Sequence, residues 1–388
     1  MTQLFNFAAR DFKRTNRRRE KMRLPITIHG NSPRGTFMTT RNCTTLASVL
    51  FFAGAAALSQ AALAQQGKLT VAWYGGNWGE AFNACVAEPF TKATGIKVVP
   101  EIGTSTTTLA KLQQQKAATT IDVAWMDGGI SELAQQAGVL EDLNVRAIPN
   151  MANVLDQAVY RSGKNTFAVG TGYYSMGLVY STKEVKQPPT SWKDLWKPEY
   201  AGTVALPSPS NSAGVPIVFF LAKVWGVDAA RLDPLYDRIR SLNTALFFDS
   251  SGAATNAYQS GDAVIGAHFN VGAWDLIDKG VPIGFAVPKE GVWATDARLH
   301  IVKGTRNKAA AEQFVNTALS REASACLATK LYLGPSVKNV SVPTEVARKL
   351  PWGTDGSVAN LNLLDWNVIN QRRAEVTDAW NRQVARKR

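Results

Sequence analysis

Short apolar strands alternate with amphipathic helices along the chain, and this order restricts the folds that it can adopt. In the first half the expected strands and helices alternate as follows: strand 68–74, helix 80–94, strand 96–99, helix 106–118, strand 121–126 and helix 129–137. Apolar residues at Phe82, Val86 and Phe90 give the first helix its spacing, and Gly95 ends it. This order predicts an α/β lobe with a largely parallel sheet, whose ligands bind beyond the carboxyl ends of the strands.

The middle of the chain repeats this order. The expected segments are strand 202–206, helix 214–225, helix 229–241, strand 245–248, helix 252–260 and strand 264–269. No short-period repeat occurs, which excludes a solenoid. The 324 residues from Gln65 onward are enough for two lobes, each with its own core.

The first 64 residues have the pattern of a leader rather than of a folded domain. Residues 46–58 form an apolar run of secretory length, and Ala62-Leu63-Ala64 is a small-x-small cleavage pattern, so we expect export with cleavage after Ala64. A permanent membrane anchor is the alternative, but it needs roughly 20 apolar residues.

Most of the chain's basic character lies in this leader. The first 64 residues hold ten Lys/Arg and two Asp/Glu, so eight of the thirteen net positive charges are there and five remain for the rest. The basic cluster at 382–388 is typical of a solvated helix end, and no nucleic-acid partner is expected. The start of translation remains open among Met1, Met22 and Met38.

Motifs that would indicate an enzyme are missing from the sequence. The turn at 75–79, Gly-Gly-Asn-Trp-Gly, lacks the spacing of a dinucleotide fingerprint, and neither a P-loop nor a G-x-S-x-G elbow occurs. His268 and His300 are the histidines beyond the leader, too few for a zinc cluster or a convincing Ser-His-Asp triad. We therefore expect no catalytic residue, no cofactor and no metal.

Six motifs spread over the chain carry a family resemblance. They are WYGGNW at 73–78, PFTKATGIKV at 89–98, GVLEDL at 138–143, PTSWKDLWKPEYAG at 189–202, GFAVPKEG at 284–291 and the helix 309–320 with its Ser-Arg-Glu continuation. Together they resemble the bacterial spermidine/putrescine periplasmic binding proteins, the extracellular solute receptors of ABC importers. The similarity covers essentially the whole chain after the leader.

The resemblance implies a type II periplasmic binding protein fold: two lobes, each a mainly parallel sheet flanked by helices, joined by crossing hinge strands. Carried over, lobe 1 comprises 65–174 and 293–339, lobe 2 comprises 175–292 and a C-terminal helical segment 340–388, and the crossings lie near 174–180 and 293–300. The solute is held in the cleft between the lobes, which close over it.

Two cysteines follow the leader, Cys85 and Cys326, and both fall in lobe 1 by this resemblance. A disulfide within one lobe would leave the hinge free to move, and in an oxidising compartment we favour it. Two buried free thiols are the alternative, because a bond needs the Cα atoms within about 7 Å.

Several lobe 1 residues are expected to face the cleft. Asn77 and Trp78 follow the glycine turn after the first strand, although Asn77 could instead cap the helix and Trp78 could belong to the core. Asp127 and Gly128 end the third strand, where the polyamine receptors place a Ser and a Tyr; Asp127 could meet a ligand amine or cap the next helix. The neighbouring pair Tyr173–Tyr174 precedes the first crossing and suits a cleft wall or hinge packing.

The resemblance also implies lobe 2 contacts. Phe269 and Asn270 align with a ligand-stacking Trp of the family, so Phe269 keeps apolar stacking and loses the indole donor. Trp293 and Asp296 match in residue type a Trp and an Asp that hold the far end of a polyamine, but their spacing differs.

The segment 206–214, Leu-Pro-Ser-Pro-Ser-Asn-Ser-Ala-Gly, departs from the family. The spermidine receptors carry acidic residues there that bind ligand ammonium groups, and this chain has Ser208, Ser210 and Asn211 instead. The hydroxyls of Ser208, Ser210 and Ser212 near the helix start at Gly214, and those of Ser250 and Ser251 near a second helix start at Gly252, would suit an anionic group of the ligand. Serines near helix caps are also common without a ligand.

The expected function is therefore a periplasmic receptor that captures a small polar solute and delivers it to an inner-membrane ABC permease. An opine, a phosphonate or another organic acid is favoured over a multivalent polyamine, and a monomer is expected. A true putrescine or spermidine receptor, a sensor that signals to a chemoreceptor, and a periplasmic hydrolase or lyase are the alternatives.

Overall fold

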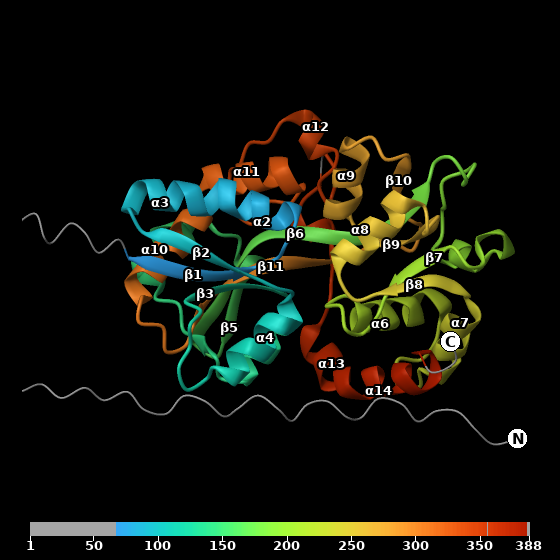
Figure 1. The fold of residues 1–388 in the computed structure, drawn as a ribbon, viewed down its shortest axis with the longest axis horizontal. Helices are drawn as coiled ribbons and strands as arrows, with labels where there is room; N and C mark the ends of the chain where they lie inside the picture. The colour runs from blue at the N-terminus through green and yellow to red at the C-terminus, as the bar shows by residue number, and fades with distance from the viewer. Residues whose placement is uncertain (1–66, 355, 386–388) are drawn as a thin grey trace, which may run out of the picture. The chain divides into compact units, whose positions relative to one another are not determined.

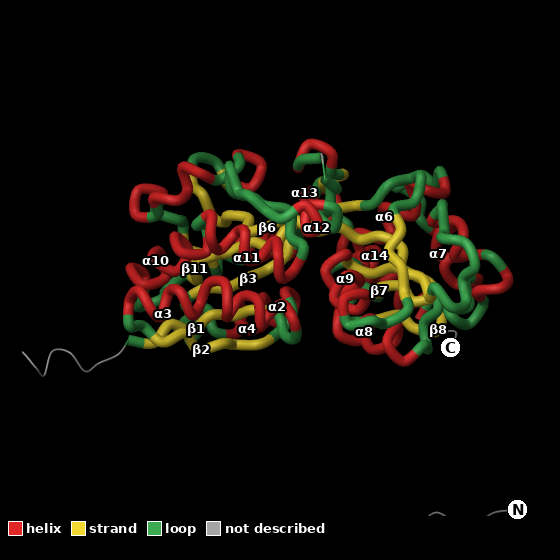
Figure 2. The backbone as a smooth tube through the Cα atoms, turned by 90° about the horizontal axis from the view of Figure 1, so that it is seen from above, coloured by secondary structure: helices red, strands yellow, loops and turns green. Residues whose placement is uncertain are grey.

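A computed structural model describes residues 67–354 and 356–385, all within one compact unit, Leu63–Arg388. The expected leader, with its cleavage after Ala64, lies outside the described residues. Two lobes lie side by side and are bridged by extended strands (Figures 1 and 2). In the described part of the chain, none of the helices combines the length and apolar character needed to cross a membrane.

Lobe 1 is built on parallel strands that alternate with helices, as the sequence predicts. Its strands are β1 (Lys68–Trp73), β2 (Lys97–Ile102), β3 (Val123–Asp127), β4 (Leu140–Glu141) and β5 (Val159–Ser162). Its helices are α2 (Asn77–Phe82), α3 (Glu88–Thr94), α4 (Ser105–Gln114), α5 (Ile130–Gln136), α10 (Lys308–Ala318) and α11 (Arg321–Leu331). Both β2 and β3 pair in parallel with β1. The predicted helix 80–94 is two α-helical segments, α2 and α3, joined by one π-helical stretch, Asn83–Ala87.

Lobe 2 repeats the arrangement with its own strands and helices. The strands are β7 (Val204–Pro207), β8 (Thr244–Phe248), β9 (Ile265–Phe269) and β10 (Ile283–Ala286). The helices are α6 (Gly214–Trp225), α7 (Asp233–Ser241), α8 (Ser251–Ser260) and α9 (Asn270–Asp278). Both β8 and β9 pair in parallel with β7. Helix α7 begins later than the predicted residue 229, with Pro234 in its first turn, where the fixed φ of proline favours a helix start.

Two strands cross between the lobes and join their sheets. They are β6 (Asn165–Ser181) and β11 (Trp293–Val302), which pair in antiparallel fashion. Strand β3 pairs with β11 in lobe 1 and β9 pairs with β6 in lobe 2, giving the order β2-β1-β3-β11-β6-β9-β7-β8. The predicted α/β fold with crossing strands is confirmed, and the crossing strands merge the two parallel parts into one mixed sheet.

The C-terminal segment contacts both lobes. Its elements are α12 (Thr344–Ala347), β12 (Asn362–Leu363), α13 (Trp366–Gln371) and α14 (Arg373–Gln383). Helix α14 contacts α6 and α7 of lobe 2, whereas α13 contacts α5 of lobe 1 as well as α6. Val346 and Leu350 pack against Ala328 of α11 in lobe 1. Helix α14 therefore packs on lobe 2, whereas the apolar side chains around α12 are buried against lobe 1.

A disulfide bond joins Cys85 to Cys326, with 5.6 Å between the Cα atoms. Cys85 lies in the π-helical stretch and Cys326 on α11. Both elements belong to lobe 1, so the bond fastens two helices of one lobe and leaves the crossing strands free. The favoured pairing is confirmed, and the alternative of two free thiols is wrong for this structure.

Candidate functional site

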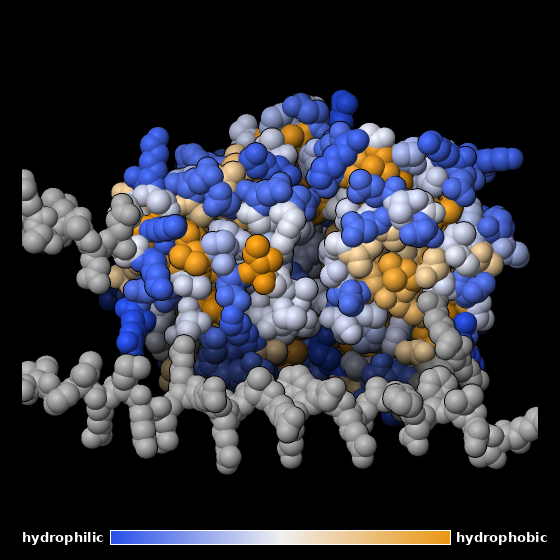
Figure 3. All heavy atoms as spheres, viewed as in Figure 1, coloured by the Kyte–Doolittle hydropathy of each residue, from blue (hydrophilic) through white to orange (hydrophobic). Residues whose placement is uncertain are grey.

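A cavity of about 730 Å³ lies between the lobes, where the surface is hollowed (Figure 3). From lobe 1 it is lined by the loops that follow β1 and β2 and by the end of β3. From lobe 2 it is lined by the first turns of α8 and by β9 and α9. It lies beyond the carboxyl ends of parallel strands, where α/β folds bind their ligands.

Asp127, the last residue of β3, presents a carboxylate to this cavity. Its Oδ1 accepts hydrogen bonds from the Tyr74 hydroxyl at 2.7 Å and from the Tyr174 hydroxyl. Its backbone N–H donates to Ser105 Oγ at 2.9 Å. Among the described residues, no hydrogen bond reaches Oδ2 and no cation pairs with the carboxylate. One oxygen is thus left for a ligand.

Asp127 does not cap the following helix. The N–H of Gly129 donates instead to the Glu132 carboxylate at 2.6 Å, which closes the first turn of α5. The competing interpretation of Asp127 as a helix cap is therefore wrong. Asn77 likewise makes no capping bond, because it is the first residue of α2 and follows Gly76, whose φ of 62° favours glycine.

The two tyrosines beside Asp127 remain protonated. Burial, and then the negative charge of Asp127, raise the pKa of Tyr74 and of Tyr174 well above the ordinary value for a phenol. Both hydroxyls therefore stay hydrogen-bond donors across the physiological pH range. They fix the carboxylate without neutralising it, which preserves its attraction for a cation.

Four aromatic rings form a wall next to this carboxylate. Trp78 meets Tyr74 and Tyr174 edge to face, each with ring centroids 5.2 Å apart. Tyr174 in turn meets Phe269 of lobe 2 at 5.0 Å. Trp78 is 8% exposed, so it packs in the core and still lines the cavity. A carboxylate bordered by aromatic rings suits the ammonium group of a ligand.

The lobe 2 side offers hydrogen-bond donors. Helix α8 begins at Ser251, and the Ser250 hydroxyl accepts the Ala253 N–H at 3.2 Å. No hydrogen bond from the Ser251 or Gly252 N–H occurs among the described residues, and a Cβ on Gly252 would meet only open space. Two backbone donors at a helix N-terminus, facing a cavity, suit an anionic group.

His268 adds a neutral imidazole to the same side. Its Nε2 shares a hydrogen bond with Thr255 Oγ1 at 3.1 Å, and burial lowers the pKa of His268 to about 4. Lys279 lies on the rim and pairs with Asp275 at 2.8 Å. The cavity thus combines an acidic and aromatic lobe 1 side with a lobe 2 side rich in donors.

Six of the predicted ligand residues line this cavity and eight do not. The six are Asn77, Trp78, Asp127, Tyr174, Ser251 and Phe269. The eight are Gly128, Tyr173, Ser208, Ser210, Asn211, Asn270, Trp293 and Asp296.

The alternation of side chains along a strand and local hydrogen bonds explain why several predicted residues do not line the cavity. Tyr173 precedes Tyr174 on β6, so its ring points to the other face, where it lies 6.2 Å from Trp352. Asn270 is fully engaged at the start of α9, since Oδ1 accepts the Ser175 N–H at 2.9 Å and Nδ2 donates to the Tyr332 carbonyl at 3.1 Å.

Hydrogen bonds to other groups of the protein occupy several polar groups of the segment 206–214. Asn211 Oδ1 accepts the Ala213 N–H at 2.9 Å and Nδ2 donates to the Asp249 carbonyl. The Ser208 hydroxyl accepts the Ser210 N–H at 3.3 Å, and the Ser210 carbonyl accepts a 3.5 Å bond from Thr106 of lobe 1. From this segment, Ser212 is the residue that lines the cavity.

The remaining three lie behind the cavity wall. Asp296 is buried in a network in which Arg298 Nε donates at 2.8 Å and the Tyr160 hydroxyl at 2.7 Å, and burial raises its pKa. Trp293 packs edge to face behind Phe269, with centroids 5.9 Å apart. The backbone at Gly128 is covered by the Trp366 and Arg298 side chains.

Sequence reasoning missed Tyr74, Ser105 and His268 as site residues. Tyr74 directly follows the first strand, so the strand-end rule that selected Asn77 applies to it as well. Ser105 opens α4 after β2 at the same edge of the sheet. His268 stands within a buried strand and gave no signal that separates it from a core residue.

Comparison with known proteins assigns the family. The family model described as bacterial extracellular solute-binding protein matches residues 86–351. The chain belongs to this family. It is thus a solute-binding receptor of the kind that serves ABC transporters.

Individual relatives agree with this assignment. The spermidine/putrescine-binding periplasmic protein of Escherichia coli K12 is 28% identical over 280 residues, 69% of this chain and 77% of the relative. The gamma-aminobutyric acid-binding protein of Pseudomonas aeruginosa is 26% identical over 322 residues, 76% of this chain and 85% of the relative. The structure of the periplasmic binding protein AgtB of A. tumefaciens R10 with agropinic acid superposes with a TM-score of 0.70 at 20% identity, covering 83% of this chain and 100% of that one.

Proposed function

We propose that this receptor binds a small solute with one cationic amine and one anionic group, held between Asp127 of lobe 1 and the first turn of α8 in lobe 2. The observation that carries the proposal is the free Oδ2 of Asp127 within the aromatic wall of Tyr74, Trp78 and Tyr174. A charged hydrogen bond in such a setting contributes about 1.5–3 kcal/mol.

The anionic end of the solute meets lobe 2. The unpaired N–H groups of Ser251 and Gly252 and the neighbouring Ser212 hydroxyl supply donors there. An ω-amino acid or an opine has this pair of charges. The relatives named for gamma-aminobutyric acid and agropinic acid support the same class.

A true polyamine receptor is the second candidate. Asp275 lines the cavity and could meet a second ammonium group. However, its Oδ2 already pairs with Lys279 at 2.8 Å, so a polyamine would have to displace that cation. The absence of acidic residues in the 206–214 segment also favours the doubly charged solute.

The receptor works as a monomer in the periplasm and docks on an inner-membrane ABC permease once its lobes have closed on the solute. The apolar run 46–58 and the Ala-Leu-Ala pattern support export with cleavage after Ala64. No chemical step is needed for this role, and we expect no turnover of the solute. Ligand contacts to both lobes supply the preference for the closed state.

A thermal-shift screen of the chain from Gln65 onward tests the solute class. The panel contains ω-amino acids, opines, phosphonates, short organic acids, putrescine and spermidine. A compound with both an amine and an acid group should raise the unfolding temperature most, because binding to the folded state stabilises it. Stabilisation restricted to spermidine would contradict the proposal.

Variants test the placement of the site. With the solute found in the screen, Asp127→Ala and Phe269→Ala should each weaken binding about tenfold in calorimetry, the size of a lost charged hydrogen bond or aromatic contact. Asp142→Ala, which removes an exposed carboxylate away from the cavity, is the matched control and should bind normally. Unchanged affinity in both cavity variants would show that the solute binds elsewhere.

A further inference from the structure

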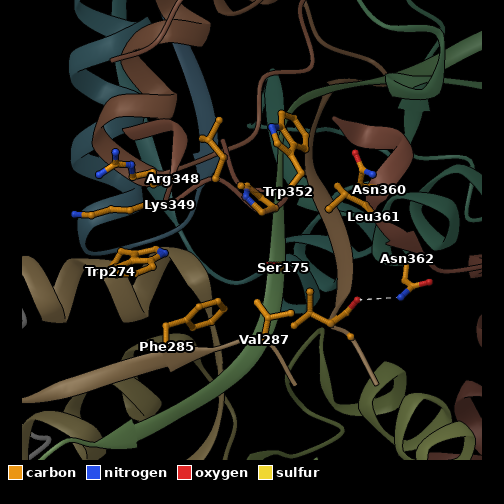
Figure 4. Close-up of a pocket in the computed structure, with 15 residues that line it drawn as sticks. Ser175, Trp274, Phe285, Val287, Arg348, Lys349, Trp352, Asn360, Leu361 and Asn362 are labelled. Carbon is orange, nitrogen blue, oxygen red and sulfur yellow. Dashed lines mark hydrogen bonds between the residues drawn. The ribbon is translucent and has the colours of Figure 1, made fainter. Parts of the chain in front are cut away.

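A second cavity, of about 470 Å³, lies on the opposite face of crossing strand β6 (Figure 4). Ser175 lines this rear cavity, while its neighbour Tyr174 lines the solute cavity. Consecutive side chains of a strand point to opposite faces of the sheet. The two cavities are therefore separated by the crossing strand itself, and the solute site does not use the rear one.

Walls of the rear cavity come from both lobes. Trp274 of α9 and Phe285 of β10 belong to lobe 2, and their rings lie 6.0 Å apart. Residues 348–353 form the opposite wall, and Leu350 in this segment packs against Ala328 of lobe 1. Figure 4 shows Trp352 projecting from this second wall across from Trp274 and Phe285.

The charged residues that line the rear cavity are both basic. Arg348 and Lys349 line the rear cavity, and none of the described lining residues is an Asp or a Glu. The Lys349 ammonium is neutralised by Asp278, with Nζ and Oδ1 2.6 Å apart. Within the described part of the chain, the exposed Arg348 guanidinium has neither an ion pair nor a hydrogen bond, so its charge is available.

We propose that the rear cavity is a second ligand site, specific for small aromatic monocarboxylates. The aromatic body would lie against Trp274, Phe285 and Trp352, and the carboxylate would pair with Arg348. A cavity lined by one unpaired arginine and three aromatic side chains matches a ligand with an apolar ring and one negative charge. A cationic or doubly charged solute of the kind proposed for the front cavity does not fit this set.

Benzoate is the probe that tests this site. It is titrated into the chain from Gln65 onward by calorimetry and by saturation-transfer NMR, beside its neutral isostere benzamide. We expect one benzoate per chain and at least fivefold weaker binding of benzamide, since benzamide lacks the charge that Arg348 recognises. Equal binding of the two compounds, or a benzoate titration that does not saturate, would overturn the proposal.

Two substitutions locate the binding. Arg348→Gln removes an exposed charge and should weaken benzoate binding about fivefold, whereas the matched control Arg231→Gln removes an exposed arginine remote from the cavity and should leave it unchanged. Phe285→Leu keeps an apolar side chain in the wall but removes the ring, and should also weaken benzoate binding. Wild-type affinity in both Arg348→Gln and Phe285→Leu would refute the site.

Discussion

The Asp127 carboxylate is held by hydroxyl groups and not by a cation. Tyr74 and Tyr174 both donate to Oδ1, and burial keeps both phenols protonated. An arginine or lysine in their place would orient the carboxylate equally well but would cancel its charge. The two tyrosines therefore orient the acid while leaving it able to attract an amine.

His300 provides a test at the residue scale because it is buried and neutral. Its Nδ1 lies 2.9 Å from the Ala124 carbonyl and its Nε2 2.7 Å from the Ser131 hydroxyl, and burial lowers the pKa of His300 to about 3. Between that value and the unfolded pKa of about 6.5, the unfolded chain binds a proton that the folded chain does not. The contribution to stability is therefore complete above about pH 6.5 and is lost as the pH falls towards 3.

From pH 7 to pH 5, His300 alone should lower the free energy of unfolding by about 2 kcal/mol. Urea denaturation of the wild type and of His300→Gln at both pH values measures it, and the variant should show the smaller loss. His268 is present in both proteins and serves as the internal control. The same pH dependence in wild type and variant would contradict the assignment.

From the sequence, residues of the candidate cavity could be predicted only where they lie at the ends of strands. Asn77 and Asp127 were predicted because they lie at or just beyond the carboxyl ends of strands at one edge of the sheet. Sequence could not choose between Tyr173 and Tyr174, because only the register of β6 decides which one faces the cavity. Asp296 does not line the cavity for another reason: besides its neighbour Arg298 on the same strand, it bonds Tyr160, a partner far away in the sequence that no local signal indicates.

At the scale of elements, local sequence signals located most helices and strands. Helix α6 spans the predicted residues 214–225, where a long apolar helix ends at Gly226 in the left-handed conformation. The antiparallel insertion of β11 beside β3 was not predictable in the same way. These strands lie far apart in the chain, and no local signal records which partner a buried strand selects.

The disulfide joins the π-helical stretch to α11, and its position predicts how its removal changes stability and solute binding. It joins two elements of lobe 1 that lie 241 residues apart in the sequence, and the loop that it closes includes lobe 2, so removing it should lower the free energy of unfolding by about 2–5 kcal/mol. The double variant Cys85→Ala/Cys326→Ala should nevertheless bind solute within about twofold of the wild type, because the bond does not cross the hinge.

Urea denaturation and calorimetry on the same samples separate these two effects. The double variant leaves no unpaired thiol in the chain from Gln65 onward, which keeps intermolecular disulfides out of the comparison. A large loss of solute affinity with unchanged stability would contradict the assignment of the bond to lobe 1 stability.

At the scale of the whole described molecule, the lobes meet on two faces of the crossing strands. On the solute side, Thr106 donates to the Ser210 carbonyl at 3.5 Å. On the rear side, Asp278 of α9 in lobe 2 accepts from Lys349 at 2.6 Å and from the Tyr332 hydroxyl, both attached to lobe 1. The rear contacts are shorter and include an ion pair, so they resist any rotation that separates the rear walls.

We expect closure of the front cleft by rotation about β6 and β11 to separate those rear walls, so that the Asp278 contacts oppose closure. Asp278→Asn removes the ion pair and should raise solute affinity by up to about fivefold, because partly exposed pairs of this kind are worth about 0.2–1 kcal/mol. Calorimetry with the solute from the thermal screen measures the change.

The surface pair of Asp237 and Arg240 on α7 supplies the control. Asp237→Asn removes a comparable ion pair that spans no hinge, so its solute affinity should equal that of the wild type. Because the Asp278 effect is purely conformational, it should appear with every solute that closes the cleft and not only with the tightest one. Equal or weaker binding in Asp278→Asn would mean that the rear contacts move with one lobe and do not oppose closure.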